Sequence, residues 1–449
     1  MSSRHVSLLV VLALVVAGVG TLATIERAAN PSAPPGVFNA SGTVESTALY
    51  CTGLTSARLG AVGSVTLINT TADARVVSVD ASSNTGQHWT TALRIAGHSS
   101  SAVRPGTQLG GDSFGLTALV SGGGVVGVVA TSARGAEAPC IATGETSWYG
   151  AGFDTTVGSD AALSIYNPTA TPAVLNVTTY SGAGFAAPAP FQGLSVGPHA
   201  EVRLDLGTQI VATPNIGVRV NVLRGVVAVV GVQRSGTRVS FNPGSTAETT
   251  SVLFPRVTTA NGALAEVRVA NPGSKSATVT LRVTLKPYTV SPLVETVRPY
   301  SSMLIKVTPN PAIPAAGYAS VQLTSNEPVI AGLATGDPRG VWLSAPGIVA
   351  ANFLAADVYG VGFDSVALSN VSTRAIDVEA LVTDSPGLSP TSHTATIPAD
   401  STSEFSTLFG ESLTKKVVAL HASAPTLQVT LTLATLPAGG VVFEPLDGR

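Results

Sequence analysis

The chain carries little charge. Of its 449 residues only 11% are Asp, Glu, Lys or Arg, and the formal net charge is −2. Proteins that bind nucleic acid through its phosphates carry a basic patch or stripe, commonly with a pI above about 9, whereas the pI here is about 6.3. The composition therefore predicts that no nucleic acid is a partner.

Cysteine is almost absent, since Cys51 and Cys140 are the only two. A structural zinc site needs about four Cys or His ligands at short spacings, and the six histidines lack the i, i+2 or i, i+4 spacing of a metal site. We therefore expect no metal and no cofactor. These histidines are His5, His88, His98, His199, His393 and His421.

The two cysteines allow one disulfide. It would close a loop of about 90 residues, which in the chain-entropy model stabilises a fold by roughly 4 to 5 kcal/mol. Disulfides persist mainly outside the cytoplasm. We predict the Cys51–Cys140 bond, and two free buried thiols are the alternative that the sequence leaves open.

Only one long apolar run is present, the 20 residues Val6–Ile25, which follow Arg4. At 1.5 Å per residue such a helix crosses a hydrocarbon core of about 30 Å, and Thr21-Leu22-Ala23 is a poor match to a signal-peptidase site. Residues 1–27 are therefore predicted to be an export signal that anchors the chain in the membrane through residues 6–25. A cleaved signal peptide with secretion is the alternative. Residues 28–46, rich in Pro, Ala and Ser, are predicted to be a linker.

A pattern of strand, asparagine, turn and strand occurs four times. The asparagines Asn69, Asn167, Asn271 and Asn370 are spaced by 98, 104 and 99 residues. Asn bonds its own nearby backbone and favours turns, so we interpret these four as structural corners. The spacing predicts four repeats, called repeats 1 to 4, with the bounds 47–145, 146–249, 250–348 and 349–449.

The repeats have the pattern of half-buried strands. Residues 278–285 and 427–433 alternate apolar and polar side chains, which is typical of strands with one buried face. Residues 226–232 are almost continuously apolar and indicate a strand covered on both faces. With about seven short strands per repeat, we predict an all-β fold of four tandem antiparallel β-sandwich-like (immunoglobulin-like) repeats after the N-terminal hydrophobic segment. A β-propeller with two blades per repeat is the alternative, disfavoured because no 50-residue period is apparent.

One sequence matches a catalytic motif. Residues 111–115 read Gly-Asp-Ser-Phe-Gly, the G-x-S-x-G pattern in which a nucleophilic serine stands between a strand and a helix. Here a further strand, residues 116–120, follows in place of a helix, and Gly115 recurs as Gly217 and Gly317 in later repeats. We therefore predict that Ser113 is not a nucleophile and that the chain has no catalytic residues.

Aromatic side chains, which form the platforms of sugar-binding sites, make up only 5% of the chain. Trp148 takes a position that is aromatic in the other repeats, so we expect it in the core. Trp89 and Trp342 have no such equivalents and stand beside loop-forming residues. They are the two candidate binding residues.

The apolar N-terminus, the motifs Tyr50-Cys51 and Pro139-Cys140 and the four apolar-x-Asn corners together resemble an uncharacterised family of actinobacterial exported proteins, a domain of unknown function. The resemblance covers nearly the whole chain after the N-terminal segment. Because the family has no assigned activity, it implies no catalytic residues. Its members look like cell-envelope proteins, sometimes encoded near glycan-assembly genes, which implies a wall-associated role.

We therefore expect a non-enzymatic cell-envelope protein, extracytoplasmic, with a structural, scaffold or binding role and an envelope glycan or envelope protein as its partner. The alternative is an extracytoplasmic hydrolase or glycan-modifying enzyme with a site built between repeats.

Overall fold

The molecule is described from a computed structural model, and the residues described all belong to one of two compact units, Phe38–Arg449. The predicted anchor, almost all of the predicted linker and parts of repeat 4 lie outside the described residues. Those described are 46–56, 62–69, 71–97, 99–131, 137–236, 238–260, 262–285, 288–315, 318–337, 340–344, 348–349, 352–356, 366–370, 373–383, 391–399, 401–404, 408–410, 417–422, 427–431 and 444–445.

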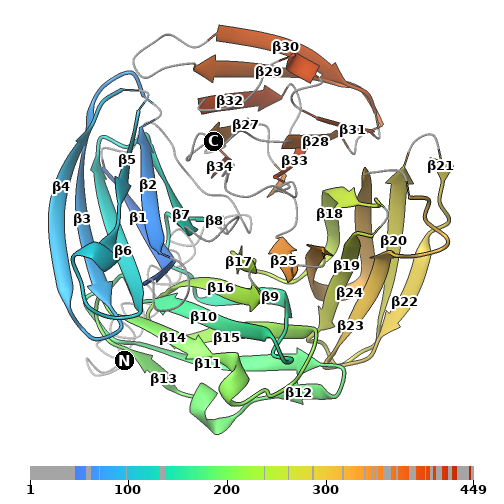
Figure 1. The fold of residues 1–449 in the computed structure, drawn as a ribbon, viewed down its shortest axis with the longest axis horizontal. Helices are drawn as coiled ribbons and strands as arrows, with labels where there is room; N and C mark the ends of the chain where they lie inside the picture. Colours follow the sequence, from blue (N-terminus) through green and yellow to red (C-terminus); the bar gives the residue numbers. More distant parts are fainter. Residues whose placement is uncertain are drawn as a thin grey trace, which may run out of the picture. The chain divides into compact units, whose positions relative to one another are not determined.

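The described residues form seven sheets in which every strand pair is antiparallel. This confirms the predicted all-β class. Figure 1 shows the strands of each sheet side by side, with residues 46–139 in blue to teal and the strands that follow in green, yellow and red.

Repeat 1 contributes two four-stranded sheets with the orders β1-β6-β3-β4 and β5-β2-β7-β8. Their elements are β1 (Ser46–Thr55), β2 (Gly63–Asn69), β3 (Arg75–Ser83), β4 (His88–Ile95), β5 (Ser100–Val103), the 3-10 helix η2 (Pro105–Thr107), β6 (Ser113–Ser121), β7 (Val125–Thr131) and β8 (Glu137–Pro139).

Repeat 2 contributes the sheets β12-β11-β15-β9, to which β13 adds, and β14-β10-β16-β17. Their elements are β9 (Ser147–Phe153), β10 (Ser159–Tyr166), β11 (Ala173–Ser181), β12 (Gly184–Ala186), η3 (Ala189–Phe191), β13 (Leu194–Val196), β14 (Glu201–Asp205), η4 (Leu206–Thr208), β15 (Ile216–Arg224), β16 (Ala228–Ser235) and β17 (Arg238–Asn242).

In repeat 3 the 20-residue strand β24 takes part in both layers, so eight strands join into one sheet. The elements are β18 (Thr249–Thr258), β19 (Leu264–Asn271), β20 (Ala277–Leu285), β21 (Tyr288–Thr289), β22 (Leu293–Val297), β23 (Ser301–Thr308), β24 (Tyr318–Asp337) and β25 (Gly340–Ser344).

Repeat 4 contributes the sheets β26-β33-β28-β31 and β30-β29-β32-β27-β34. The elements are β26 (Ile348–Val349), β27 (Asn352–Ala356), β28 (Val366–Asn370), β29 (Ile376–Thr383), β30 (Thr391–Ile397), β31 (Ser401–Glu404), β32 (Val417–Ala422), β33 (Leu427–Leu431) and β34 (Glu444–Pro445).

The cores lie between the paired sheets. In repeat 1, Leu67 of β2 and Leu116 of β6 belong to one buried cluster although their strands are in different sheets. In repeat 2 the same holds for Leu163 of β10 and Val218 of β15. Alternation explains this, because every second side chain of a strand points to the same face.

The four corner asparagines are buried and make nearly the same bonds. In each, Nδ2 donates to the carbonyl four residues later at 2.7 Å and to carbonyls at the end of a strand 26 to 30 residues later. In the first three, Oδ1 accepts the backbone N–H two residues on. Each Asn side chain therefore links its own turn to the end of a neighbouring strand by hydrogen bonds. This supports the interpretation of the four asparagines as structural corners. The four are Asn69, Asn167, Asn271 and Asn370.

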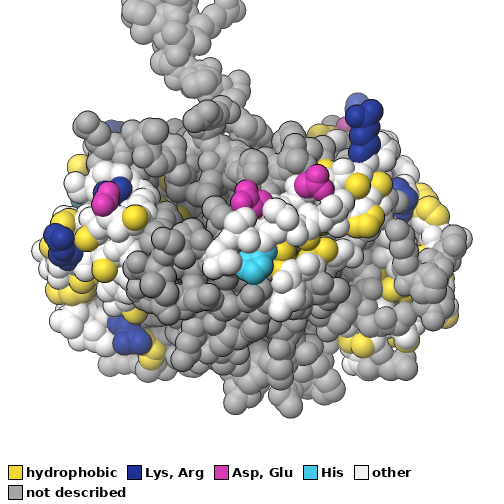
Figure 2. All heavy atoms as spheres, turned by 90° about the horizontal axis from the view of Figure 1, so that it is seen from above, with side chains coloured by type: hydrophobic (Ala, Val, Ile, Leu, Met, Phe, Trp, Pro, Cys, Tyr) yellow, Lys and Arg dark blue, Asp and Glu magenta, His cyan; other side chains and the backbone are white. Residues whose placement is uncertain are grey.

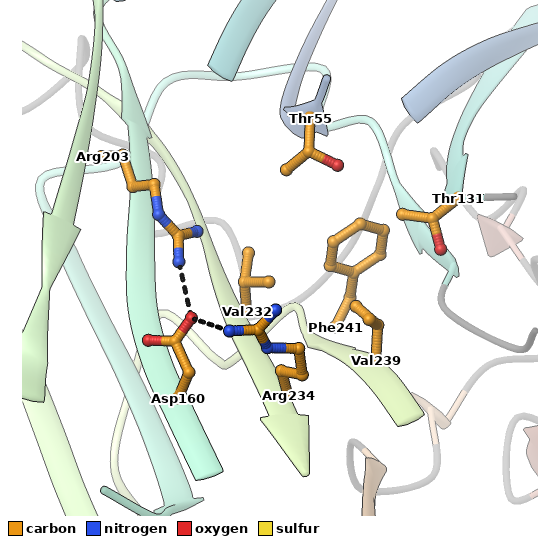
Figure 3. Close-up of a pocket in the computed structure, with 8 residues that line it drawn as sticks. All are labelled: Thr55, Thr131, Asp160, Arg203, Val232, Arg234, Val239 and Phe241. Carbon is orange, nitrogen blue, oxygen red and sulfur yellow. Dashed lines mark hydrogen bonds and ion pairs between the residues drawn. The ribbon is translucent and has the colours of Figure 1, made fainter. Parts of the chain in front are cut away.

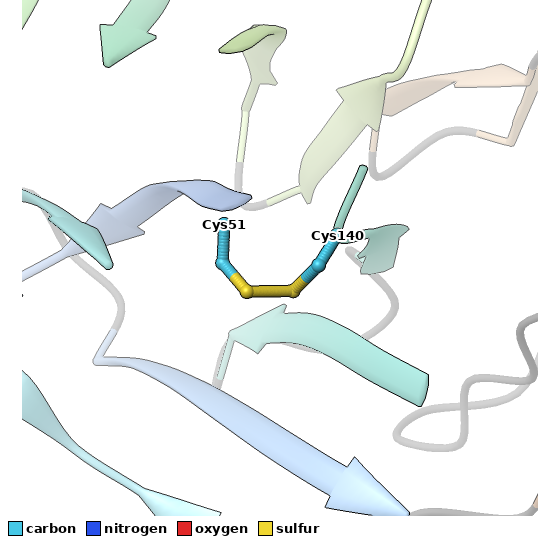
Figure 4. The surroundings of a disulfide bond; sticks show 2 residues. All are labelled: Cys51 and Cys140. Carbon is cyan, nitrogen blue, oxygen red and sulfur yellow. A yellow bond between two sulfur atoms is a disulfide. The ribbon is translucent and has the colours of Figure 1, made fainter. Parts of the chain in front are cut away.

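The disulfide is present between Cys51 of β1 and Cys140, which follows β8 (Figure 4). Both residues are buried in the core of repeat 1. A Cβ added at Gly127 would meet the Cys140 Sγ at 2.8 Å, so the small residue on β7 leaves room for the bond. The predicted pairing is confirmed.

Candidate functional site

A buried polar network joins repeats 1 and 2. The Glu201 carboxylate of β14, only 2% exposed, accepts hydrogen bonds from the hydroxyls of Ser113 at 2.5 Å and Ser164 at 2.7 Å. The Ser164 oxygen in turn accepts the Gly53 N–H at 2.8 Å and lies 2.8 Å from the Thr52 hydroxyl. Since the Ser164 proton is used on Glu201, Thr52 is the donor in that last bond.

The environment of Glu201 favours its protonated form. Burial raises its pKa from 4.5 to about 7, although the hydrogen bonds from Ser113 and Ser164 and the positive charge of Arg203 act in the opposite direction. Burial disfavours a carboxylate because water no longer solvates the charge. The group therefore titrates near neutral pH inside the junction.

Next to this network, the lack of a side chain at Gly115 leaves room for the ring of Tyr166. A Cβ on Gly115 of β6 would lie 2.1 Å from a ring carbon of Tyr166. Tyr166 is fully buried, and its hydroxyl is 2.9 Å from the Thr117 hydroxyl. Gly115 lies within β6, not ahead of the strand as expected, and the close approach of repeat 2 explains why the position is glycine.

Replacing Gly115 by Ala should therefore lower the free energy of unfolding. Overpacking at a site that cannot yield costs about 1 to 3 kcal/mol, measurable by urea denaturation. Gly182→Ala is the matched control, because a Cβ there meets nothing within 4 Å. Equal effects of the two substitutions would show that contact with Tyr166 is not the cause.

Repeats 2 and 3 meet in the same way. A Cβ on Gly217 of β15 would lie 2.3 Å from the Cβ of Ala270, and both residues hold the positions that Gly115 and Tyr166 hold in the first junction. Asn215 and Ser302 take the places of Ser113 and Glu201, and the Ser302 hydroxyl donates to the Asn215 carbonyl at 2.5 Å. The third glycine of this series, Gly317, lies outside the described residues.

The second junction also buries an ion pair. Arg268 of β19 donates through Nη2 to Glu266 at 3.1 Å and through Nη1 to the Gly152 carbonyl of repeat 2 at 2.6 Å. Both charged residues are buried. Removing one partner of such a pair is strongly destabilising, because it leaves an uncompensated buried charge.

Ser113 does not have the surroundings of a nucleophile. Its side chain is 1% exposed and its proton goes to Glu201. A catalytic serine needs an accessible oxygen beside a base that a third group orients. Two residues of the motif, Ser113 and Gly115, instead contact repeat 2 at the junction.

A small surface pocket opens at the same junction (Figure 3). It is open to solvent, and its lining includes Arg203 of β14, Arg234 of β16 and Asp160 of β10. Both guanidinium groups reach the same Asp160 oxygen, Arg203 at 3.2 Å and Arg234 at 3.7 Å. The remaining lining residues are Thr55, Thr131, Val232, Val239 and Phe241.

The pocket has an excess of one positive charge, because two guanidinium groups share one carboxylate. Arg234 is half-exposed and stands beyond normal hydrogen-bond distance from Asp160. A guanidinium offers a planar set of N–H donors that match a carboxylate or phosphate. The arrangement is therefore suited to an oxyanion.

No group of three or more His, Cys, Asp or Glu among the described residues could hold a metal ion. On the face drawn in Figure 2, the described acidic and basic side chains do not gather into one patch of either sign.

The tryptophans lie on strands. Trp148 is fully buried in the core of repeat 2, as predicted. Trp89 is on β4, half-buried and packed against the core of repeat 1, while Trp342 is on β25 opposite Thr335. Trp89 is not among the residues that line the pocket, and the binding role of Trp89 and Trp342 stays a prediction.

In the described part of the chain, no helix has both the length and the apolar character needed to cross a bilayer. The predicted segment 6–25 lies outside that part.

A family described as "Family of unknown function (DUF5719)" matches residues 115–408, and no curated protein matches the chain. Among solved structures, the chain is similar at 13% identity to a "tetra-tandem repeat in extending region of large adhesion protein". That alignment covers 90% of this chain and all of the other with a TM-score of 0.11, which is too low to support an argument from its fold.

Proposed function

The chain belongs to the family of unknown function DUF5719, and we propose that it is a non-enzymatic envelope protein in which four fused β-sandwich repeats form a stiff extracytoplasmic support. On its surface, the pocket between repeats 1 and 2 binds an oxyanion group of an envelope glycan or protein.

The nature of the two described junctions carries the proposal. Each has a glycine without room for a Cβ and polar groups bonded across the boundary. Repeats joined by a flexible linker would expose these faces to water. Buried and bonded faces favour a fixed arrangement, as a support requires.

Two further observations support the reading. The core of repeat 1 also includes Val230, Val232 and Phe241 of repeat 2, so sheet-on-sheet packing continues across the junction. The disulfide is typical of proteins outside the cytoplasm. The hydrolase alternative gains nothing from Ser113, whose hydroxyl is enclosed in the junction.

Arg234→Ala is the substitution that tests the binding site. Because a charge-assisted hydrogen bond contributes about 1.5 to 3 kcal/mol, we expect retention of the purified chain on isolated envelope fractions to weaken about tenfold or more. Sedimentation of the chain with those fractions, over a range of salt concentrations, measures this.

Arg94→Ala is the matched control, since Arg94 is an exposed arginine on β4 outside the pocket. Equal weakening by both substitutions would mean that binding depends on overall charge and not on the pocket. No retention of the wild-type chain by any envelope fraction would contradict the binding role altogether.

A further inference from the structure

The central strands β2 and β7 of repeat 1 are buried on both faces. Their inward residues, such as Leu67 and Val129, lie in the core. Six outward residues are also no more than 5% exposed, although none of them packs in the cores described above. They form the cross-strand pairs Ser64 with Ala130, Thr66 with Val128 and Ile68 with Val126.

The equivalent face in repeats 2 and 3 is covered by the repeat before it. In repeat 2 the outward residues of β10 and β16 face repeat 1, and Val230 and Val232 belong to the core of that repeat. In repeat 3, Ala270 and Ile330 pack with Tyr149 and Ala151 of β9.

This face is covered each time by the same two strands of the preceding repeat. They are the first strand of that repeat and the strand that is hydrogen-bonded to it. These are β1 with β6 in repeat 1 and β9 with β15 in repeat 2. In repeat 3 the opening strand β18 contacts β28 and β33 of repeat 4. Three successive junctions thus place an opening strand on the next repeat.

Two surfaces remain outside this series: the covering strands of repeat 4 and the outward face of repeat 1. The covering strands are β27 and β32, where Leu354 pairs with Ala419, as Tyr50 pairs with Thr117 in repeat 1. The face is the outward side of β2 and β7, which is mostly apolar and already shielded from water. Burial of such a face needs a partner, because apolar surface left in water is costly.

We infer that β27 and β32 of repeat 4 pack on the outward face of β2 and β7, so that the last repeat is joined directly to the first. The residues expected to be in contact follow from the equivalent positions in the junction between repeats 1 and 2. Thr66 corresponds to Ser164, and Ala356 corresponds to Thr52, whose hydroxyl lies 2.8 Å from that of Ser164. Thr66 and Ala356 are therefore neighbours.

The test is a pair of cysteines in the full-length chain, Thr66→Cys with Ala356→Cys. Mild oxidation should form an intrachain disulfide, identified by mass spectrometry of the peptides, with the native Cys51–Cys140 bond mapped in the same digest to show that repeat 1 is folded. A short bis-maleimide should join the same two positions if the thiols are a few ångströms apart.

The control is Thr66→Cys with Thr394→Cys, because Thr394 is an exposed residue of β30 in the same sheet of repeat 4. This pair should not crosslink. Equal crosslinking of both pairs, or a disulfide between two chains, would overturn the inference, the latter by assigning the face to a second copy. The absence of any crosslink would also overturn the inference. This holds whether the thiol introduced by Thr66→Cys reacts freely with a monofunctional maleimide or is shielded by some other segment.

Discussion

Loss of the disulfide through Cys51→Ala with Cys140→Ala is expected to lower the free energy of unfolding of repeat 1 by about 4 to 5 kcal/mol. The bond joins residues 89 apart in sequence, and breaking it gives the unfolded chain back the freedom of that loop. Alanine is chosen because a serine hydroxyl would be buried without a defined partner in this apolar core.

Amide hydrogen exchange in β3 and β6 measures this loss locally, which matters because a chain of several repeats need not unfold in a single step. Reduction of the wild-type chain is the control and should produce the same increase in exchange in those strands, with smaller changes in repeat 3. A loss below about 1 kcal/mol would mean that contact with repeat 2 and the core hold repeat 1 together without the bond.

The features that the sequence predicted correctly are those that depend on local chemistry. The corner asparagines recur at nearly constant spacing, and each holds its own turn through the carbonyl four residues later. Alternation predicted the strand character of residues such as 278–285, all of which lie in β20. With only two cysteines in the chain, the choice of pairing was already reduced to one.

The junctions could not be predicted, because they depend on which face of one repeat meets the next. Glu201 opens an alternating strand, and nothing nearby in sequence shows that Ser113, 88 residues earlier, would meet it. Two signals did point to these contacts. The continuous apolar stretch 226–232 belongs largely to β16, which is buried on both faces, and the recurrent glycines Gly115 and Gly217 mark the closest approaches.

The pocket escaped prediction for a related reason. Asp160, Arg203 and Arg234 come from three different strands, and in the sequence each alone looks like an ordinary strand charge. Only the pairing of β10 with both β14 and β16 brings them together. Trp89 and Trp342 are candidates because they lack equivalents in the other repeats and stand beside loop-forming residues. Both lie on strands, β4 and β25, which the neighbouring sequence did not indicate.

Glu201→Gln should stabilise the chain at pH 8 and abolish part of its pH dependence. Folding raises the pKa of Glu201 from 4.5 to about 7, so the folded state binds the proton more tightly than the unfolded state. The resulting stabilisation is complete below pH 4.5 and is lost as pH rises toward 7. A shift of this size corresponds to a loss on the order of 3 kcal/mol.

Glutamine is suited to the site because it matches the protonated acid. When Glu201 is ionised, both serine hydroxyls donate to it. When it is protonated, one carboxyl oxygen becomes a donor and the Ser113 hydroxyl turns to accept. The amide of glutamine likewise has a donor group beside an acceptor oxygen, although its NH₂ carries two N–H donors where the acid has one O–H. We therefore expect the variant and the wild type to be about equally stable at pH 4.5, with the variant more stable at pH 8.

Urea denaturation of both proteins from pH 4.5 to 8 measures the difference. Burial also raises the pKa of Glu145, to about 8, so the wild type and the variant share a second loss of stability that extends to higher pH, and only the difference between them belongs to Glu201. Glu327→Gln is the control, since the Glu327 carboxylate pairs at the surface with Lys275 at 3.5 Å and its replacement should change stability by less than about 1 kcal/mol at either pH. If Glu201→Gln lowered stability at pH 8, the ionised carboxylate would be the form that the junction requires, and the two serine donors would outweigh the cost of burying its charge.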